Sequence, residues 1–222
     1  MGQNKHNAGQ GRDPAFPRLL GDRLCLDFAN TIESPLGRQP EEFLHDYADL
    51  ARWSRHVGLL DDDATALLLD EAARWPEDAA AVYADALDLR AALTAIFRAI
   101  AHDDTPAADD LDQLQHAYLT ALARARLTPQ AGGYAWDWSG ADADAALDRS
   151  LWDIAQSATA LLTTGDLTRV RQCPGANDCG WLFYDTSKNG SRRWCSMEGC
   201  GSRVKMRQQY ARKRGAEVRS AG

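Results

Sequence analysis

Two absences narrow the class of protein to which this chain can belong. No stretch of the 222 residues approaches the roughly 18 consecutive apolar residues of a membrane-spanning helix. The first 17 residues are polar and lack the apolar segment of a secretory signal, and His6 stands where a myristoylation motif requires Ser or Thr. We therefore expect a disordered lead-in at residues 1–18, no membrane partner and a cytoplasmic protein.

Signatures of catalysis are missing as well. The sequence has no glycine-rich phosphate loop, no H-E-x-x-H and no G-x-S-x-G. Its five histidines fall in the lead-in or within expected helices, and none follows His116. Runs of Asp, as at residues 61–63, are typical of helix starts rather than of paired catalytic acids. The sequence thus predicts a protein that is not an enzyme.

Charge is divided unevenly along the chain. The net charge is −7, but residues 167–222 contain 12 Lys and Arg against 4 Asp and Glu, so this tail carries +8 and the preceding 166 residues carry −15. Such asymmetry indicates two modules, of which the second is cationic. We place the boundary near Leu167.

Hydrophobic periodicity predicts that the first module is a helical bundle over residues 19–166. We expect a short strand or extended segment at residues 24–29, and a short hairpin or strand where Tyr134, Trp136 and Trp138 alternate. Five helices are expected, with Gly58 and Gly165 ending the first and the last of them, at residues 41–57, 61–75, 77–102, 110–127 and 142–164.

Cysteine is scarce until the tail, where four residues form the pattern C-x5-C-x15-C-x4-C: Cys173, Cys179, Cys195 and Cys200. Two close pairs joined by a hairpin-length spacer suit a tetrahedral zinc ion, and with all four positions occupied by thiolates such a zinc has a structural role. An iron–sulfur site, redox thiols and two disulfides are the alternatives. The remaining Cys25, between two leucines, is expected to be a small buried residue.

The spacer predicts how the site is built. We expect a strand over residues 180–185, a turn at Asn189-Gly190 and a return strand over residues 192–195. Gly180 and Gly201 each follow a proposed ligand, where a positive φ would let backbone N–H groups turn toward the sulfurs.

Several motifs resemble known families. The segments "DLTRVRQCP", "DCGWLFYD", "RRWCSMEGCG" and "ARKR" resemble the CGNR zinc finger, and "LCLDFANT" resembles the opening of the ABATE domain that commonly precedes it. The resemblance runs from about Leu19 to Arg214, with Ser202 where Asn is usual. It implies a mainly α fold: a helical bundle with short extended segments, then a small ββα treble-clef or ribbon-like zinc module over residues 167–214 and a disordered tail over 215–222. It also implies a stress-linked transcription regulator or an RNA or DNA binder.

A basic helix is expected after Cys200, with Ser202 as a possible N-cap and with Val204 and Tyr210 facing the zinc hairpin. Arginine pairs with phosphate in a bidentate manner, and Trp181, Phe183, Tyr184 and Trp194 could stack on unpaired bases or form the core of the module. DNA or RNA is therefore the expected partner, while docking on the acidic bundle, a protein-interaction module and a thiol-based redox switch remain open. The candidate nucleic-acid contacts are Lys188, Arg192, Arg193, Arg203, Lys205, Arg207, Arg212, Lys213 and Arg214.

Arg90 lies among apolar neighbours in the expected helix 77–102, so it needs a partner, and Asp27 is the candidate. A structural ion pair is one interpretation. The other is a pocket for a small-molecule or protein ligand, formed by Asp27, Asn30 and Arg90, which would make the bundle a sensor.

Overall fold

The computed structural model describes residues 13–33, 41–138, 145–175 and 179–220. Most of the expected lead-in, and the last two residues of the expected tail, lie outside this range. The end of the lead-in is part of the fold, because Phe16 is buried with its ring against His56. Residues 215–220 continue the last helix, which therefore runs past Arg214.

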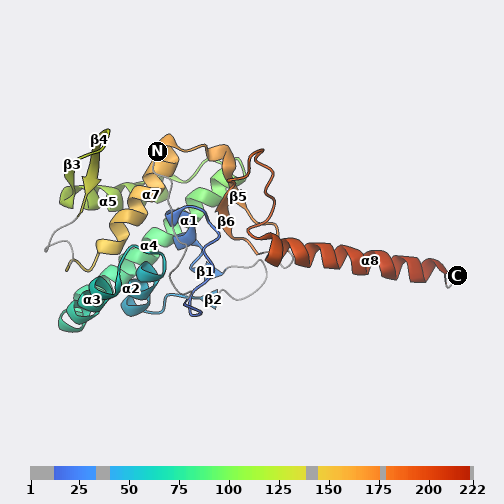
Figure 1. Cartoon of the computed structure of the whole chain (residues 1–222), viewed down its shortest axis with the longest axis horizontal. Coiled ribbons are helices and arrows are strands. Elements are labelled where there is room, and N and C mark those ends of the chain that lie inside the picture. The colour runs from blue at the N-terminus through green and yellow to red at the C-terminus, as the bar shows by residue number, and fades with distance from the viewer. Residues whose placement is uncertain (1–12, 34–40, 139–144, 176–178, 221–222) are drawn as a thin grey trace.

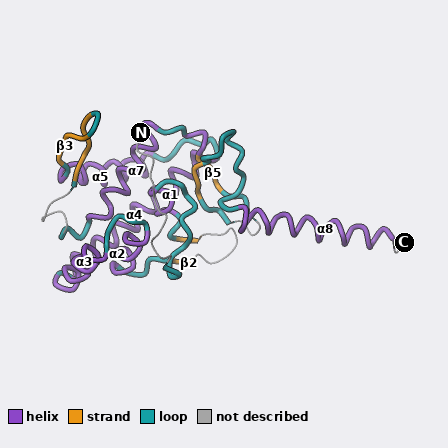
Figure 2. The backbone as a smooth tube through the Cα atoms, viewed as in Figure 1, coloured by secondary structure: helices purple, strands orange, loops and turns teal. Residues whose placement is uncertain are grey.

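The protein is mainly α-helical and has a small module at its C-terminal end, as the sequence predicts (Figures 1 and 2). The elements of the first module are α1 (Leu24–Ala29), β1 (Ile32–Glu33), β2 (Glu41–Glu42), α2 (Tyr47–His56), α3 (Asp62–Arg74), α4 (Pro76–Ala101), α5 (Ala108–Arg124), β3 (Arg126–Gln130), β4 (Gly133–Asp137) and α7 (Arg149–Thr164). The second module contains a 3₁₀ turn η1 (Leu167–Arg169), β5 (Val170–Gln172), β6 (Leu182–Tyr184), a π-helical turn η2 (Met197–Gly201) and α8 (Ser202–Ser220).

Local signals set several helix ends. The carboxylates of Asp46 and Asp61 accept hydrogen bonds from the N–H groups of Asp49 and Ala64, and so cap α2 and α3. Gly58, with φ of 79°, lies just beyond the C-cap of α2. The helix expected from residue 41 starts only at Tyr47, because Glu41 and Glu42 instead form β2, which pairs with β1.

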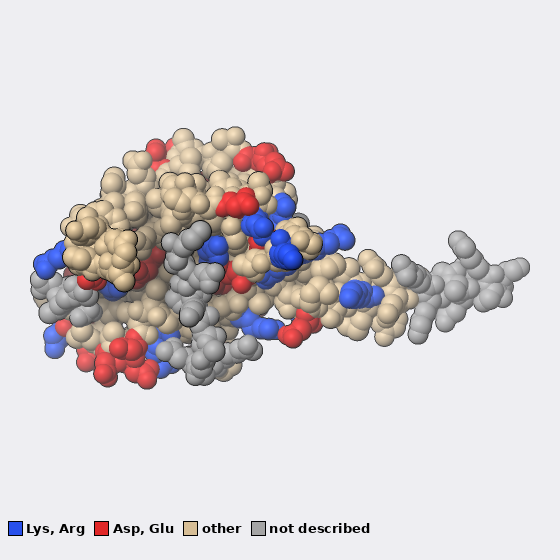
Figure 3. Space-filling view, turned by 45° about the horizontal axis from the view of Figure 1, so that its top comes forward, with Lys and Arg blue, Asp and Glu red and all other residues tan. Residues whose placement is uncertain are grey.

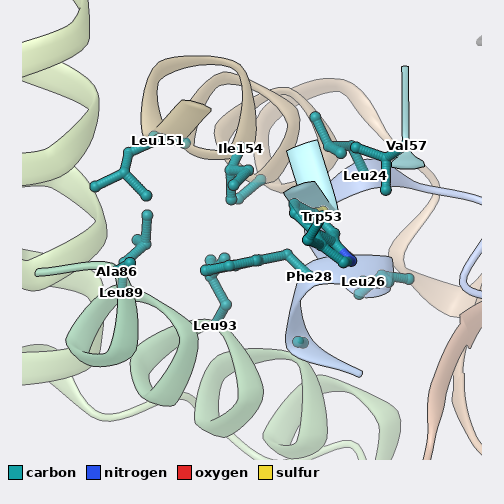
Figure 4. Close-up of a cluster of buried hydrophobic side chains, with 14 of the residues drawn as sticks. Leu24, Leu26, Phe28, Trp53, Val57, Ala86, Leu89, Leu93, Leu151 and Ile154 are labelled. Atoms are coloured by element: carbon teal, nitrogen blue, oxygen red, sulfur yellow. The ribbon is translucent and has the colours of Figure 1, made fainter. Parts of the chain in front are cut away.

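The prediction of an extended segment at residues 24–29 is wrong, because these residues form helix α1. Leu24, Leu26 and Phe28 face the core, but Cys25 and Ala29 are buried as well. A helix enclosed by other helices is apolar all round, and in six residues that pattern cannot be distinguished from a strand. The core in which α1 lies also contains side chains of α2, α4 and α7 (Figure 4).

The hairpin expected around Tyr134 is confirmed as the antiparallel pair β3–β4, with Ala131 and Gly132 at its turn. Trp138, directly after β4, is buried, and its indole Nε1 donates a 2.7 Å hydrogen bond to the carbonyl of Ala121 in α5. This bond and the packing of Trp138 near Trp152 of α7 attach the base of the hairpin to the bundle.

The second module shares the core of the first. Strand β5 pairs with β6, and Val170, Leu182 and Tyr184 are buried in the same hydrophobic cluster as the bundle helices. The return strand expected over residues 192–195 is wrong: β6 pairs with the strand that precedes Cys173, and residues 192–195 form no strand. The β5–β6 hairpin is thus fixed on the bundle rather than joined to it by a free linker.

Candidate metal centre

The β5–β6 hairpin places the first pair of cysteines. Cys173 follows β5 and Cys179 lies shortly before β6, and the Cys173 N–H donates a 2.8 Å hydrogen bond to the carbonyl of Trp181. A Cβ on Gly175 would lie 2.5 Å from the Cys179 Cβ and 3.1 Å from the Cys200 Sγ, so only glycine fits there. Gly180 has a φ of 70°, which confirms the prediction of a positive φ at that position.

A tight turn before α8 places the second pair. Cys195 precedes η2 and Cys200 lies within it, and the Ser196 hydroxyl accepts the N–H of Gly199 to cap this turn. Two details differ from expectation. Gly201 has no positive φ, because it continues the helical turn, and the N-cap role expected for Ser202 belongs to Ser196. The Ser202 hydroxyl instead donates to the carbonyl of Met197.

The four sulfurs converge on one point. All four Sγ atoms lie within 4.8 Å of one another, and the Cys179–Cys195 and Cys195–Cys200 separations are both 3.7 Å. Four sulfurs about 2.3 Å from a tetrahedral zinc ion lie about 3.8 Å apart, so the cluster fits Zn²⁺. The Cys195 N–H also donates to the Cys173 Sγ at 3.3 Å, as expected for a backbone group that supports a metal-bound thiolate.

The electrostatics of the cluster favour a cation at its centre. Hydrogen bonds from the thiols of Cys179 and Cys195 lower the pKa of Cys173 to about 2. Hydrogen bonding to this thiolate raises the pKa of Cys179 to about 12 and also raises that of Cys195. Only one of these groups ionises readily by itself, whereas a divalent cation allows all four to bind as thiolates. Because no ligand position is left for water, such a zinc ion holds the module together and performs no hydrolysis.

Arg192, one of the candidate nucleic-acid contacts, supports the metal centre. Its guanidinium donates to the carbonyl of Cys195 at 2.5 Å and to that of Leu20 at 3.0 Å, and it pairs with the carboxylate of Asp22. It also lies over the ring of Phe183, 4.5 Å from the ring centroid. Arg192 thus joins a zinc ligand to the start of the first module, and its donors are occupied within the chain.

Asp185 and Arg169 hold the loop that precedes Arg192. The buried carboxylate of Asp185 accepts the N–H groups of Ser187 and Arg192. These bonds outweigh burial, which acts in the opposite direction, and lower the pKa of Asp185. Arg169 donates to the carbonyls of Asp185 and Ser187 at 2.8 and 2.9 Å. Neither role was predicted from the sequence, although a lone Asp directly after a strand is a turn signal.

The other candidate nucleic-acid contacts are placed differently from Arg192. Lys188, Arg193, Arg203, Lys205 and Arg207 are all exposed. Lys and Arg side chains are visible at the base of α8 and along it (Figure 3). Arg212, Lys213 and Arg214 belong to the last part of α8, which points away from the body of the protein (Figure 1).

The aromatic residues of the module are mostly enclosed. Phe183 and Tyr184 are buried, and Trp181 and Trp194 are half-buried against the cysteine cluster. The interpretation of these rings as a miniature core therefore holds better than that of a stacking surface. The expectation that Tyr210 faces the zinc hairpin is wrong, because 68% of this residue is exposed, whereas Val204 is half-buried.

The three residues of the suggested ligand pocket have partners within the chain. Arg90 pairs with Glu42 rather than with Asp27, through two hydrogen bonds of 2.6 and 2.5 Å. The side-chain amide of Asn30 donates to the carbonyl of Leu182 at 2.8 Å and accepts its N–H at 2.9 Å. Both partners come from segments that the sequence analysis placed elsewhere: Glu42 in a helix, and Leu182 in a separate module.

Asp27 and Cys25 lie beside this joint on α1. Asp27 accepts the N–H of Gly21 at 2.7 Å, and burial raises its pKa to about 7. Cys25 is completely buried, as expected, and burial raises the pKa of its thiol to about 12. A thiol with that pKa and no exposure is unreactive.

Each of the two modules matches a known protein family. Residues 22–165 match the ABATE family, described as "Putative stress-induced transcription regulator", and residues 169–213 match the CGNR zinc finger. A search of curated proteins found no match. Among the helices that the structure describes, none is both long and apolar enough to cross a membrane. Since the first match covers more than half of the chain and the second contains all four clustered cysteines, the protein belongs to the ABATE family and carries a C-terminal CGNR zinc finger.

Proposed function

We propose that the protein is a nucleic-acid-binding regulator, that α8 together with the exposed cations beside the zinc module forms its binding surface, and that zinc has a structural role. The observation that carries this proposal is the placement of α8, which starts two residues after the ligand Cys200 and extends away from the body (Figure 1). Residues 202–220 contain seven Lys and Arg and one acidic residue. A cationic helix that stands clear of an acidic body is suited to contact phosphates.

Double-stranded nucleic acid is the favoured form. Recognition of single strands depends on aromatic faces on which bases stack. Phe183 and Tyr184 are buried, and Trp181 and Trp194 pack on the cysteine cluster, so these rings offer little surface for stacking. A projecting helix fits the major groove of a B-form DNA duplex. The projection of α8 also gives no support to docking of the basic tail on the acidic bundle.

The test is fluorescence anisotropy of the zinc-loaded full chain with labelled duplex DNA, single-stranded DNA and RNA, at about 50 and 200 mM salt. The variant Arg203→Gln/Lys205→Gln/Arg207→Gln removes three charges from α8. Its matched control, Arg52→Gln/Arg55→Gln/Arg74→Gln, removes three exposed charges from the first module. Zinc content is checked in every sample.

We expect duplex binding that weakens steeply with salt, and a log–log salt slope that falls by up to about three in the α8 variant and stays unchanged in the control. Absence of binding at micromolar protein, or equal binding by the α8 variant, would overturn the proposal. A preference for single strands would overturn the assignment of a duplex.

The second candidate function is a protein-interaction module. It is favoured by Met206 and Tyr210, which are 51% and 68% exposed on α8. If the zinc-loaded protein binds no nucleic acid, this function replaces the first. In both cases the four thiolates need a reducing compartment, so we place the protein in the cytoplasm. Because four cysteine ligands leave no open position on the zinc ion, we assign the protein no catalytic activity.

A further inference from the structure

Arg98 of α4 is a half-buried cation that has no partner among the residues that the structure describes. Its Nε atom is enclosed and has no hydrogen-bond acceptor, and its two Nη atoms reach the surface without meeting a described carboxylate or carbonyl. Every other buried or half-buried arginine in the described part of the chain donates to a carboxylate or carbonyl oxygen: Arg23, Arg90, Arg149, Arg169 and Arg192. The guanidinium of Arg98 therefore has donors that can bind an acceptor from outside the described chain.

An unpaired charge in this position opposes folding. A guanidinium stays charged at any pH that the protein meets, and enclosing a charge without a counter-ion is costly. Burial lowers the pKa of Arg98, and no described carboxylate counters this effect. Acids are not scarce, because residues 1–166 carry −15. Two turns earlier on the same helix, Arg90 is paired with Glu42. A cation that stays unpaired in an acidic module indicates a site at which a ligand supplies the counter-charge.

The neighbour of Arg98 on the helix surface links this site to the second module. His102 follows one turn later at the end of α4, and residues four apart are neighbours on one face of a helix. Its Nε2 atom lies 2.6 Å from the Oε1 atom of Gln172 in β5, and the Nε2 of this glutamine donates to the carbonyl of Gly180 at 3.1 Å. Gly180 directly follows the ligand Cys179. Arg98 therefore lies where α4 meets the strand that leads into the metal centre.

We propose that Arg98 binds the phosphate or carboxylate group of a small anionic ligand at this junction between α4 and β5. The planar guanidinium matches either group, because two parallel N–H donors can bind two oxygens of the same anion. Two charge-assisted hydrogen bonds correspond to a dissociation constant of about 0.05–5 mM for the bare anion, before the rest of the ligand adds contacts. The site belongs to the helical bundle rather than to α8, so the proposal does not depend on nucleic-acid binding.

The first test is isothermal titration calorimetry of the zinc-loaded full chain, freed of excess zinc, with inorganic phosphate and separately with succinate at constant ionic strength. We expect saturable binding of at least one of these anions, and the tighter of the two identifies the chemical class of the ligand. Arg98→Gln should weaken this binding at least tenfold, and Arg98→Lys, which keeps the charge but not the paired donors, should also bind more weakly than the wild type. The control Arg126→Gln removes an exposed charge from β3 and should bind like the wild type.

Stability and NMR separate a binding role from a structural one. In chloride buffer Arg98→Gln should be at least as stable to urea as the wild type, because the substitution removes a charge that lacks a counter-ion. The anion that binds should raise the urea midpoint of the wild type and leave that of Arg98→Gln unchanged. In ¹⁵N spectra, the side-chain amide of Gln172 should shift during the titration of the wild type but not during that of the variant, since Gln172 is held by the neighbour of Arg98.

Several results would overturn the proposal. They are the absence of saturable binding of either anion up to about 20 mM, well above the weakest expected dissociation constant, equal binding by Arg98→Gln, and a lower urea midpoint of this variant in chloride. A variant that binds duplex DNA more weakly, in a protein that binds neither anion, would assign Arg98 to the nucleic-acid surface instead. If the anion binds as expected but no nucleic acid does, the site stands and only the function proposed for α8 fails.

Discussion

Replacement of Asn30 by alanine tests whether the two modules are joined as the structure shows. Asn30 is 4% exposed, and its side chain forms hydrogen bonds with both the N–H and the C=O of Leu182, which is 2% exposed. In effect, this amide replaces a third strand beside β6. Alanine at this position leaves two buried backbone groups without a partner.

The expected loss follows from the cost of those two groups. Each unsatisfied buried group costs about 1–3 kcal/mol, so Asn30→Ala, which leaves two of them, should lower the free energy of unfolding by about 2–6 kcal/mol. Asn30→Asp keeps an acceptor for the Leu182 N–H but loses the donor to its C=O, so it should also destabilise the protein. The matched control is Asn189→Ala, in the exposed turn of the zinc module, which should change stability by less than about 0.5 kcal/mol.

The assay is urea unfolding followed by far-UV circular dichroism, with zinc in slight excess for every variant. A change below about 1 kcal/mol for Asn30→Ala, similar to that of Asn189→Ala, would refute the reasoning, because the contact between α1 and β6 would then carry little of the stability.

Three further predictions concern charged residues. Arg192→Lys keeps the charge but cannot reproduce the donor geometry of the guanidinium. The apparent affinity of the protein for zinc, measured by competition with a chelator, should therefore fall about tenfold, whereas nucleic-acid binding should not change. Unchanged zinc affinity would contradict the role of this residue. Glu42→Gln should cost about 2–3 kcal/mol at neutral pH because it leaves the buried Arg90 without its counter-ion. Burial acts to raise the pKa of Glu42, but hydrogen bonds from Arg90 hold it below its usual value. The stabilisation by this ion pair is therefore present above about pH 4.3 and disappears as the pH falls through the folded-state pKa. Urea unfolding of the wild-type protein and of Glu42→Gln from about pH 3 to 7 should show that their difference in stability closes at the acid end. Burial raises the pKa of Asp27 to about 7, so the folded state favours the protonated form and stability should fall as the pH rises from about 4 to 7; Asp27→Asn should remove this slope, and an unchanged slope would contradict the assignment.

The metal centre was largely predictable because its information is local. Cys173, Cys179, Cys195 and Cys200 are all of one residue type, lie within 28 residues and have the spacing of two turns, so the ligand set follows from the sequence alone. Helices α2 and α3, capped by Asp46 and Asp61, were also predictable because their signals are local, although the sequence placed the start of α2 six residues too early. A cap or a turn depends on neighbours within a few residues.

The roles of individual cations were not predictable. Arg192 and Arg193 are adjacent and chemically identical, yet the first binds Cys195, Leu20 and Asp22 while the second is exposed. Which of two neighbouring side chains points inward depends on the path of the loop from Asp185, and the sequence predicted a strand over residues 192–195 instead of this loop.

By itself, the sequence determined the two-module composition, the zinc ligands and the basic character of the last helix. Only the tertiary structure decided that the modules share one core, that Asn30 completes the edge of β6, and that Arg90 pairs with Glu42. The physical reason is the separation along the chain of the residues that interact. Periodicity, capping and cysteine spacing act between residues close in the chain, whereas Asn30 and Leu182 are 152 positions apart and meet only because burial of the α1 and β6 side chains brings them together.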